Sequence, residues 1–191
     1  HYTIPTGNWQ HKGSSVDFDK KEYYDTLSRT WYMERILRDQ KGVMQRYDDE
    51  KRIGLCVDEW GIWTDVMEGT NPGFLYQQNS MRDAILASIN LNLFNLNSDR
   101  VKMANIAQIV NVLQAIVLTE GEKMVLTPTY HVFDMFKEHM EATLVYSNIE
   151  NKQLVEGEYL PAVSQSVSVD DEGRMHITIS NASLDEDFEI D

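Results

Sequence analysis

The sequence predicts an α/β fold followed by an antiparallel β region, and two observations carry this prediction. Short apolar runs alternate with amphipathic helical segments through the first 142 residues, which is the rhythm of a parallel α/β fold. Beyond Ala142 the runs become short and rich in β-formers, with turn residues between them. We therefore expect one domain over residues 1–142 and part of a second, β-rich domain over residues 143–191.

Composition narrows the classes of partner. The 191 residues include 31 acidic and only 17 basic side chains, a formal charge of −14 that repels phosphate backbones and argues against nucleic acid. No apolar run approaches the roughly 20 residues that span a bilayer, so we expect no membrane partner. The single cysteine, Cys56, lies in an apolar run and is expected to be a small core residue.

The first elements follow from periodicity and from helix-start chemistry. Residues 1–3 read as the end of a strand, and Pro5, Gly7 and Gly13 mark a long loop after it. Residues 17–20 carry helix-start chemistry, and residues 22–47 have apolar side chains at near-helical spacing, which Gly42 weakens toward the end. We expect one helix there.

The middle of the chain alternates between strands and helices. Residues 53–57 form a continuous apolar run, typical of a strand buried on both faces, and the run ends at Asp58 and Glu59. A helix is expected over residues 76–95, with a stripe of Met81, Ile85, Ile89 and Leu93. Residues 100–104 suggest another strand, residues 106–118 are ambiguous, and Pro128 begins a helix through residue 140.

Three short runs in the last quarter of the chain predict antiparallel strands. They cover residues 143–146, 165–169 and 175–180. The sequence DDEG at residues 170–173 separates the last two and is typical of a hairpin connection. The acidic residues 185–191 are expected to form a solvated edge.

The candidate for chemistry is Glu59. A carboxylate where an apolar strand gives way to a loop occupies the position at which parallel α/β barrels carry catalytic side chains. Trp60 and Trp63 flank it, and aromatic faces stack on sugar rings while a carboxylate can trap an oxocarbenium-like centre. The alternative is an ordinary strand-end turn with a partly buried tryptophan, and four residues do not decide between the two.

A collinear series of motifs adds to this reading. The series is VDEWGIW (57–63), GTNPGFLYQQN (69–79), MRDA (81–84), DRVKMANIAQ (99–108), VNVLQ (110–114), TEG (119–121) and TPTYHVF (127–133). In this order and spacing, over roughly residues 1–145, the sequence resembles the α-L-arabinofuranosidases of glycoside hydrolase family 51. The resemblance implies the C-terminal part of a (β/α)8 TIM barrel, followed by the start of an antiparallel β-sandwich domain.

The resemblance also implies roles for individual residues. Glu59 matches the catalytic nucleophile, Trp63 an aromatic wall of the arabinose subsite, and Gln108 a residue that hydrogen-bonds the sugar. Tyr2 matches a tyrosine that faces the nucleophile, although His1 and Thr3 fit that motif in a shifted alignment. Trp63 could instead be a core residue, and Gln108 a polar group at a helix start.

A retaining glycosidase needs a second carboxyl group, which the family carries on an earlier strand in an Asn-Glu segment. Glu22, Glu34 and Glu50 do not match that segment. We therefore expect the chain to be truncated at both ends, to lack the acid/base glutamate, and to be inactive and poorly stable alone. The resemblance implies no cofactor and no metal, an arabinose-containing oligo- or polysaccharide as substrate, and a homo-oligomer. Localisation stays open.

Two other functions remain compatible with the sequence. One is another retaining barrel glycosidase, such as an endoglucanase or xylanase. The other is a non-catalytic carbohydrate-binding homologue that kept the fold. His131 and His139 lie eight residues apart near Asp134 and Glu138, but they form no compact ligand set, and we expect solvated or core histidines there rather than a metal site.

Overall fold

The computed structural model describes residues 1–190, so residue 191, the last of the expected second domain and of the acidic edge, lies outside the described residues. The helices are α1 (Lys20–Thr30), α2 (Tyr32–Gln45), η1 (Pro72–Phe74), α3 (Met81–Leu96), α4 (Pro128–Phe136) and η2 (Lys137–His139). The strands are β1 (Tyr2–Thr3), β2 (Leu55–Ile62), β3 (Val101–Ile106), β4 (Val117–Glu120), β5 (Lys123–Leu126), β6 (Thr143–Val145), β7 (Val163–Val169) and β8 (Met175–Asn181).

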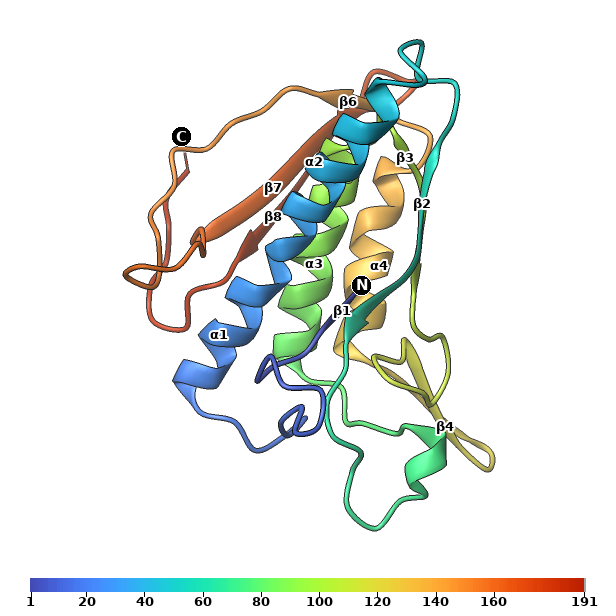
Figure 1. Ribbon diagram of the computed structural model, residues 1–191, viewed down its shortest axis with the longest axis vertical. Coiled ribbons are helices and arrows are strands. Elements are labelled where there is room, and N and C mark those ends of the chain that lie inside the picture. The colour runs from blue at the N-terminus through green and yellow to red at the C-terminus, as the bar shows by residue number, and fades with distance from the viewer. Residues whose placement is uncertain (191) are drawn as a thin grey trace.

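The described residues form three layers (Figure 1). Strands β1, β2 and β3 make a parallel sheet in that order, the helices lie against one side of it, and the antiparallel sheet β6-β7-β8 lies beyond the helices. Helix α3 contacts both β2 and β7 and so lies between the two sheets. The expected α/β fold with a following antiparallel region is therefore confirmed.

The expectation for the strand at residues 53–57 was partly wrong. The strand begins at Leu55, and Leu55 and Val57 pack half-buried against the helical layer. Cys56 points the other way and is exposed, so it is not a core residue. Successive residues of the run are apolar whichever face of the strand they point to, but among the described residues only one face of the parallel sheet is covered by helices.

The helix expected over residues 22–47 is two helices that meet at Trp31. Asp19 accepts a hydrogen bond from the backbone N–H of Glu22, and the Glu22 carboxylate accepts one from the N–H of Asp19, so a capping box starts α1. Trp31 ends α1 and precedes α2, and Gly42 lies inside α2 without interrupting it. The helix-start chemistry was read correctly, whereas the break was not anticipated.

Helix α3 is the central helix of the molecule. It begins at Met81 rather than near residue 76, because Ser80 and Asp83 form a capping box there. Met81 is 65% exposed and so does not belong to the core stripe expected for it, whereas Ile89 and Leu93 are buried. Contact with a sheet on each side explains why both polar and apolar side chains of α3 are buried.

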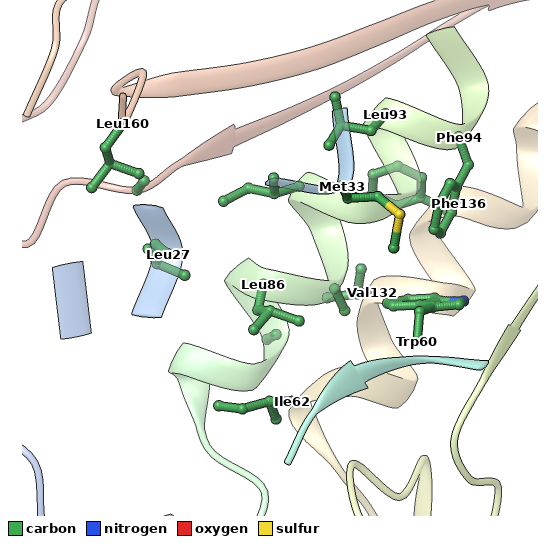
Figure 2. Close-up of a cluster of buried hydrophobic side chains, with 14 of the residues drawn as sticks. Leu27, Met33, Trp60, Ile62, Leu86, Leu93, Phe94, Val132, Phe136 and Leu160 are labelled. Atoms are coloured by element: carbon green, nitrogen blue, oxygen red, sulfur yellow. The ribbon is translucent and has the colours of Figure 1, made fainter. Parts of the chain in front are cut away.

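The core joins the parallel strands to the helices. Trp60 is fully buried, stacks on Phe133 with ring centroids 6.0 Å apart, and meets Phe94 edge-on at 5.3 Å. Figure 2 shows Trp60 and Ile62 pointing from β2 toward Leu86 and Val132 of the helical layer. The residue that follows Glu59 is thus an anchor of the hydrophobic core.

The ambiguous residues 106–118 are irregular and lead into a hairpin that the sequence did not indicate. Strands β4 and β5 pair antiparallel from Val117 opposite Leu126 to Glu120 opposite Lys123. Helix α4 starts at Pro128 as expected but ends at Phe136, and η2 continues to His139. In residues 1–190, no helix is long and apolar enough to cross a membrane.

A polar seam joins α3 to the antiparallel sheet. The Asn92 Oδ1 accepts a hydrogen bond of 2.8 Å from Ser166, its Nδ2 donates one of 3.0 Å to Ser164, and Asn95 donates one of 3.0 Å to Ser166. The hairpin expected at residues 170–173 is confirmed, with Val169 paired to Met175. The opposite face of the sheet carries apolar side chains, and Ile177 is 56% exposed there.

His139 joins η2 to this sheet through both nitrogens of its ring. Its Nδ1 lies 2.8 Å from the hydroxyl oxygen of Ser168, and its Nε2 lies 3.0 Å from that of Thr178. Burial, followed by the neighbouring His176, lowers the pKa of His139 below its usual value. Asp170 accepts a hydrogen bond of 3.0 Å from His176 and lies behind it.

We expect His139→Gln to flatten the pH dependence of stability. Because the folded state favours the neutral imidazole, the contribution of His139 to the unfolding free energy is complete above the pKa of an unfolded histidine, about 6.5. It is lost as the pH falls through that value toward the lower pKa of the folded state. Chemical denaturation between about pH 7.5 and about pH 5 should show a smaller loss of unfolding free energy in the glutamine variant. Parallel curves for the two proteins would contradict this.

Candidate functional site

A bulge in β2 sets the direction of Glu59. Val57 pairs with Ala104 and Trp60 with Ile106, so three residues of β2 span the distance that two residues of β3 span. Such a bulge changes which face successive side chains point to. Leu55 and Val57 face the helices before it and Trp60 faces them after it. The two acids between, Asp58 and Glu59, are both exposed.

Tyr2 binds the carboxylate of Glu59. Strand β1 runs parallel to β2, with Tyr2 opposite Gly61, and the Tyr2 hydroxyl donates a hydrogen bond of 2.9 Å to Glu59 Oε2. Burial, the hydrogen bond to Glu59 and its negative charge raise the pKa of Tyr2 to about 12. The phenol therefore stays a donor throughout the working range of an enzyme. The phenol holds one oxygen of the Glu59 carboxylate, Oε2, and makes no hydrogen bond to the other.

The shifted alignment places Thr3 where a tyrosine would face Glu59. Thr3 is buried, and its hydroxyl oxygen lies 3.3 Å from that of Thr30 on α1. It therefore belongs to the interface between β1 and α1 and is directed away from Glu59. The geometry favours Tyr2 over Thr3 as the partner of the carboxylate.

Trp63 lies beside this pair and outside the core. Its ring makes edge-to-face contacts with the rings of Tyr2 and Trp9, with centroids 4.9 and 5.1 Å apart. Trp63 is half-buried, whereas Trp60 is the tryptophan that fills the core. A partly open indole next to a carboxylate is the arrangement that sugar-binding sites use, because the ring face can stack on C–H groups.

Two buried glutamines hold the backbone on either side of Trp63, and reasoning from the sequence missed their role. Gln114 accepts a hydrogen bond of 2.8 Å from the N–H of Ile62 and donates one of 2.7 Å to the carbonyl of Asp83. Gln77 accepts one of 3.0 Å from the N–H of Thr64 and donates one of 3.2 Å to the carbonyl of Ile62. Their positions lay in two of the motifs, but no local pattern indicates partners so far away in sequence.

Gln108 lies just beyond the carboxyl end of β3, the strand next to Glu59. The N–H of Ala107 donates a hydrogen bond of 3.0 Å to the carbonyl of Trp60, and the Ala107–Gln108 peptide bond is cis. Gln108 is exposed and starts no helix, because residues 107–116 are irregular. No hydrogen bond of its side chain is found within residues 1–190, so it could reach a ligand, and its sugar-binding role stays a prediction.

Two of the three acids that do not match the expected acid/base segment have structural partners. Glu22 belongs to the capping box of α1, and Glu50 pairs with Arg52 at 3.3 Å. Among the described residues, no group of three or more His, Cys, Asp or Glu side chains is placed to hold a metal ion. The described site therefore brings together the exposed carboxylate of Glu59, the phenol of Tyr2 that donates to it, and the indole of Trp63.

Comparisons with known proteins identify the family of the chain. The model of the α-L-arabinofuranosidase C-terminal domain family matches residues 58–189. The chain is 45% identical over its whole length to an intracellular exo-α-L-arabinofuranosidase of Bacteroides ovatus, of which it spans 37%.

Solved structures give the same result. The crystal structure of the family 51 arabinofuranosidase from Xanthomonas axonopodis pv. citri superposes with a TM-score of 0.89 at 45% identity, over 95% of this chain and 37% of that one. A thermostable family 51 α-L-arabinofuranosidase from Thermotoga petrophila RKU-1 gives 0.70 at 25% identity, over 86% and 36%. The chain belongs to the α-L-arabinofuranosidase C-terminal domain family, in agreement with its resemblance to glycoside hydrolase family 51.

Proposed function

We propose that the full-length protein is a retaining exo-glycosidase that removes terminal non-reducing α-L-arabinofuranosyl groups from arabinan, arabinoxylan and their oligosaccharides. The observation that carries this proposal is the Tyr2–Glu59 hydrogen bond beside the open ring of Trp63. A carboxylate held by a neutral donor next to an aromatic wall suits attack on a sugar carbon.

The mechanism assigns each group one task. One oxygen of Glu59 attacks the anomeric carbon while a second carboxyl group protonates the leaving oxygen, which yields a covalent arabinosyl-enzyme. Water then attacks the same carbon, the second group accepts its proton, and Glu59 leaves, so the configuration is retained. Tyr2 holds Glu59 in place, Trp63 stacks on the ring and Gln108 binds a hydroxyl group. We place the second carboxyl group on a strand that precedes β1, and we expect the 191-residue chain alone to show no turnover.

We propose further that β1, β2 and β3 are the last strands of a (β/α)8 barrel formed by residues 1–142 together with preceding chain. Both outer strands of the sheet lack a partner on one side among the described residues. An open groove also runs along β1, lined by Thr3, Arg29 and Tyr32 among others. Unpaired edges of parallel strands are normally covered, and a strand that precedes β1 in the chain would pair with its free edge.

The same reasoning applies to residues 143–191. The face of β8 that points away from α3 exposes Met175, Ile177 and Ile179 by 62%, 56% and 49%. A second sheet packed on this apolar face would complete a β-sandwich. We also propose, from the family resemblance alone, that the full-length protein is a homo-oligomer and needs no cofactor.

Substrate comparison on the full-length protein tests the function. We expect hydrolysis of 4-nitrophenyl α-L-arabinofuranoside, and far slower hydrolysis of the corresponding xyloside and glucoside. In water–methanol mixtures, NMR should show the α-methyl arabinofuranoside as the first transfer product, because two displacements retain the configuration. A preference for xyloside or glucoside would favour another retaining glycosidase, and binding without turnover would favour a carbohydrate-binding homologue.

Tyr2→Phe tests the role of the phenol. Loss of a hydrogen bond to a charged group should lower kcat by about tenfold to hundredfold, because Glu59 is no longer held for attack. The ring still packs against Trp63, so the thermal unfolding midpoint should change little. Steady-state kinetics over a pH range, together with thermal melts, measure both. An unchanged kcat would remove Tyr2 from the mechanism.

A further inference from the structure

The loop between β1 and α1 is held in one shape by its own hydrogen bonds. The N–H of Thr6 donates to the carbonyl of Lys12 at 3.2 Å, and the N–H of Gly7 donates to the carbonyl of Ile4 at 2.9 Å. Gly7 has a φ of +72° and Gly13 a φ of +98°, values that side-chain-bearing residues rarely adopt. A Cβ at Gly13 would also lie 3.2 Å from the Thr6 side chain. These hydrogen bonds and the two glycines give the loop a defined conformation.

The loop is fastened to the segment that carries Trp63. The N–H of Trp63 donates to the carbonyl of Thr3 at 3.0 Å, and the N–H of Asp65 donates to that of Gly13 at 2.9 Å. The Asp65 carboxylate in turn accepts hydrogen bonds of 3.1 Å from the N–H groups of Lys12 and Gly13. The loop therefore keeps a fixed position relative to Trp63 and Glu59.

The loop presents an exposed tryptophan to the site. Trp9 is 54% exposed, although it makes an edge-to-face contact with the Trp63 ring. The Lys12 ammonium lies 5.3 Å from the Trp9 ring and 5.7 Å from that of Trp63. Tyr2, Trp63 and Trp9 thus form a continuous row of rings that begins at the Glu59 carboxylate, and the Lys12 ammonium lies close to the last two of them.

We propose that Trp9 and Lys12 form a second sugar-binding surface, which holds the sugar unit to which the terminal arabinofuranosyl group is attached. This inference rests on the proposed function and adds a determinant of substrate choice. The Trp9 ring supplies a stacking face, and the Lys12 ammonium donates hydrogen bonds to sugar hydroxyl oxygens. The row of rings is longer than a single furanose needs, so the outer part suits the next unit of the glycan.

Kinetics of the full-length protein with two substrates test this proposal. Methyl α-L-arabinofuranoside has no second ring, whereas α-1,5-arabinobiose has one. For Trp9→Ala, we expect kcat/KM on arabinobiose to fall roughly tenfold, mainly through KM, since one stacking contact is lost. The value for the methyl glycoside should stay within about twofold, because its only ring binds beside Trp63. Trp9→Phe keeps a ring and should recover most of the loss.

The remaining outcomes are decisive as well. An equal fall with both substrates would show that Trp9 only supports Trp63 and would overturn the second surface. No change with either substrate would overturn it too. Lys12→Met should raise KM for arabinobiose alone, and an effect on both substrates would argue against its role. If the unaltered protein hydrolyses neither substrate, the proposed function itself fails, which is distinct from these results.

Discussion

Glu59→Ala in the full-length protein is expected to lower kcat on an aryl arabinofuranoside by about 10⁴-fold. Without this carboxylate, the group that we propose to form the covalent intermediate is missing. Glu59 is exposed on the open side of the bulge, so its removal leaves no cavity, and the circular dichroism spectrum and melting midpoint should stay close to those of the unaltered protein. The measurement is steady-state turnover with a matched thermal melt.

Chemical rescue gives this prediction a stricter test. Azide is small enough to enter the space left by the Glu59 side chain and to attack the anomeric carbon from the same face. The variant should then release β-L-arabinofuranosyl azide, the inverted product, and recover part of its rate. Asp58→Ala is the matched control, because Asp58 is the neighbouring acid in β2 and is also exposed. Equal losses for both variants, or no azide product, would refute Glu59 as the nucleophile.

Trp60→Ala is expected to have the largest effect on stability, about 3–5 kcal/mol of unfolding free energy. The indole is fully buried between Phe94 and Phe133, so truncation removes apolar contact and leaves a large cavity. Domain stabilities are typically about 5–15 kcal/mol, so the variant should be partly unfolded or should melt much earlier. Urea denaturation followed by circular dichroism measures the change.

Two further variants make the Trp60 prediction specific. Trp60→Phe keeps a ring, and the Trp60 Nε1 has no hydrogen-bond partner within residues 1–190, so this variant should lose clearly less stability. Tyr47→Ala removes an aromatic side chain that is 87% exposed and should change the unfolding free energy by less than about 0.5 kcal/mol. If Trp60→Ala lost as little unfolding free energy as Tyr47→Ala, the assignment of Trp60 to the hydrophobic core would be wrong.

The sequence predicted those parts of the fold that depend on local chemistry. The helix start within residues 17–20, Pro128 at a helix start and the hairpin at residues 170–173 are set by neighbouring residues, and all three are present. Glu59 was expected where the strand at residues 53–57 gives way to a loop, and this was wrong: β2 continues to Ile62, so Glu59 lies at a bulge inside the strand. The sugar-site roles of Tyr2, Trp63 and Gln108 stay predictions that the variants above would test.

The remaining features depend on contacts that a single sequence does not display. The break at Trp31 falls inside a continuous helical pattern, and the β4–β5 hairpin has no alternating pattern strong enough to reveal it. Gln114 reaches Ile62 across 52 residues, so its role appears only when the strands are assembled. The exposure of Cys56 follows from which face the helices cover, and an apolar run cannot specify that face.

The bulge in β2 has a consequence for insertions and deletions. Because three residues there span what two span in β3, the strand changes phase between Val57 and Trp60. Deleting Asp58 or Glu59 would remove the bulge and restore strict alternation, with Val57 and Trp60 still facing the helices and the remaining acid facing away from them. Inserting one residue would instead make the middle residue of the segment face the helices. The one-residue excess is therefore not needed to bury Trp60, and its effect is to place two exposed acids side by side between two residues of the core.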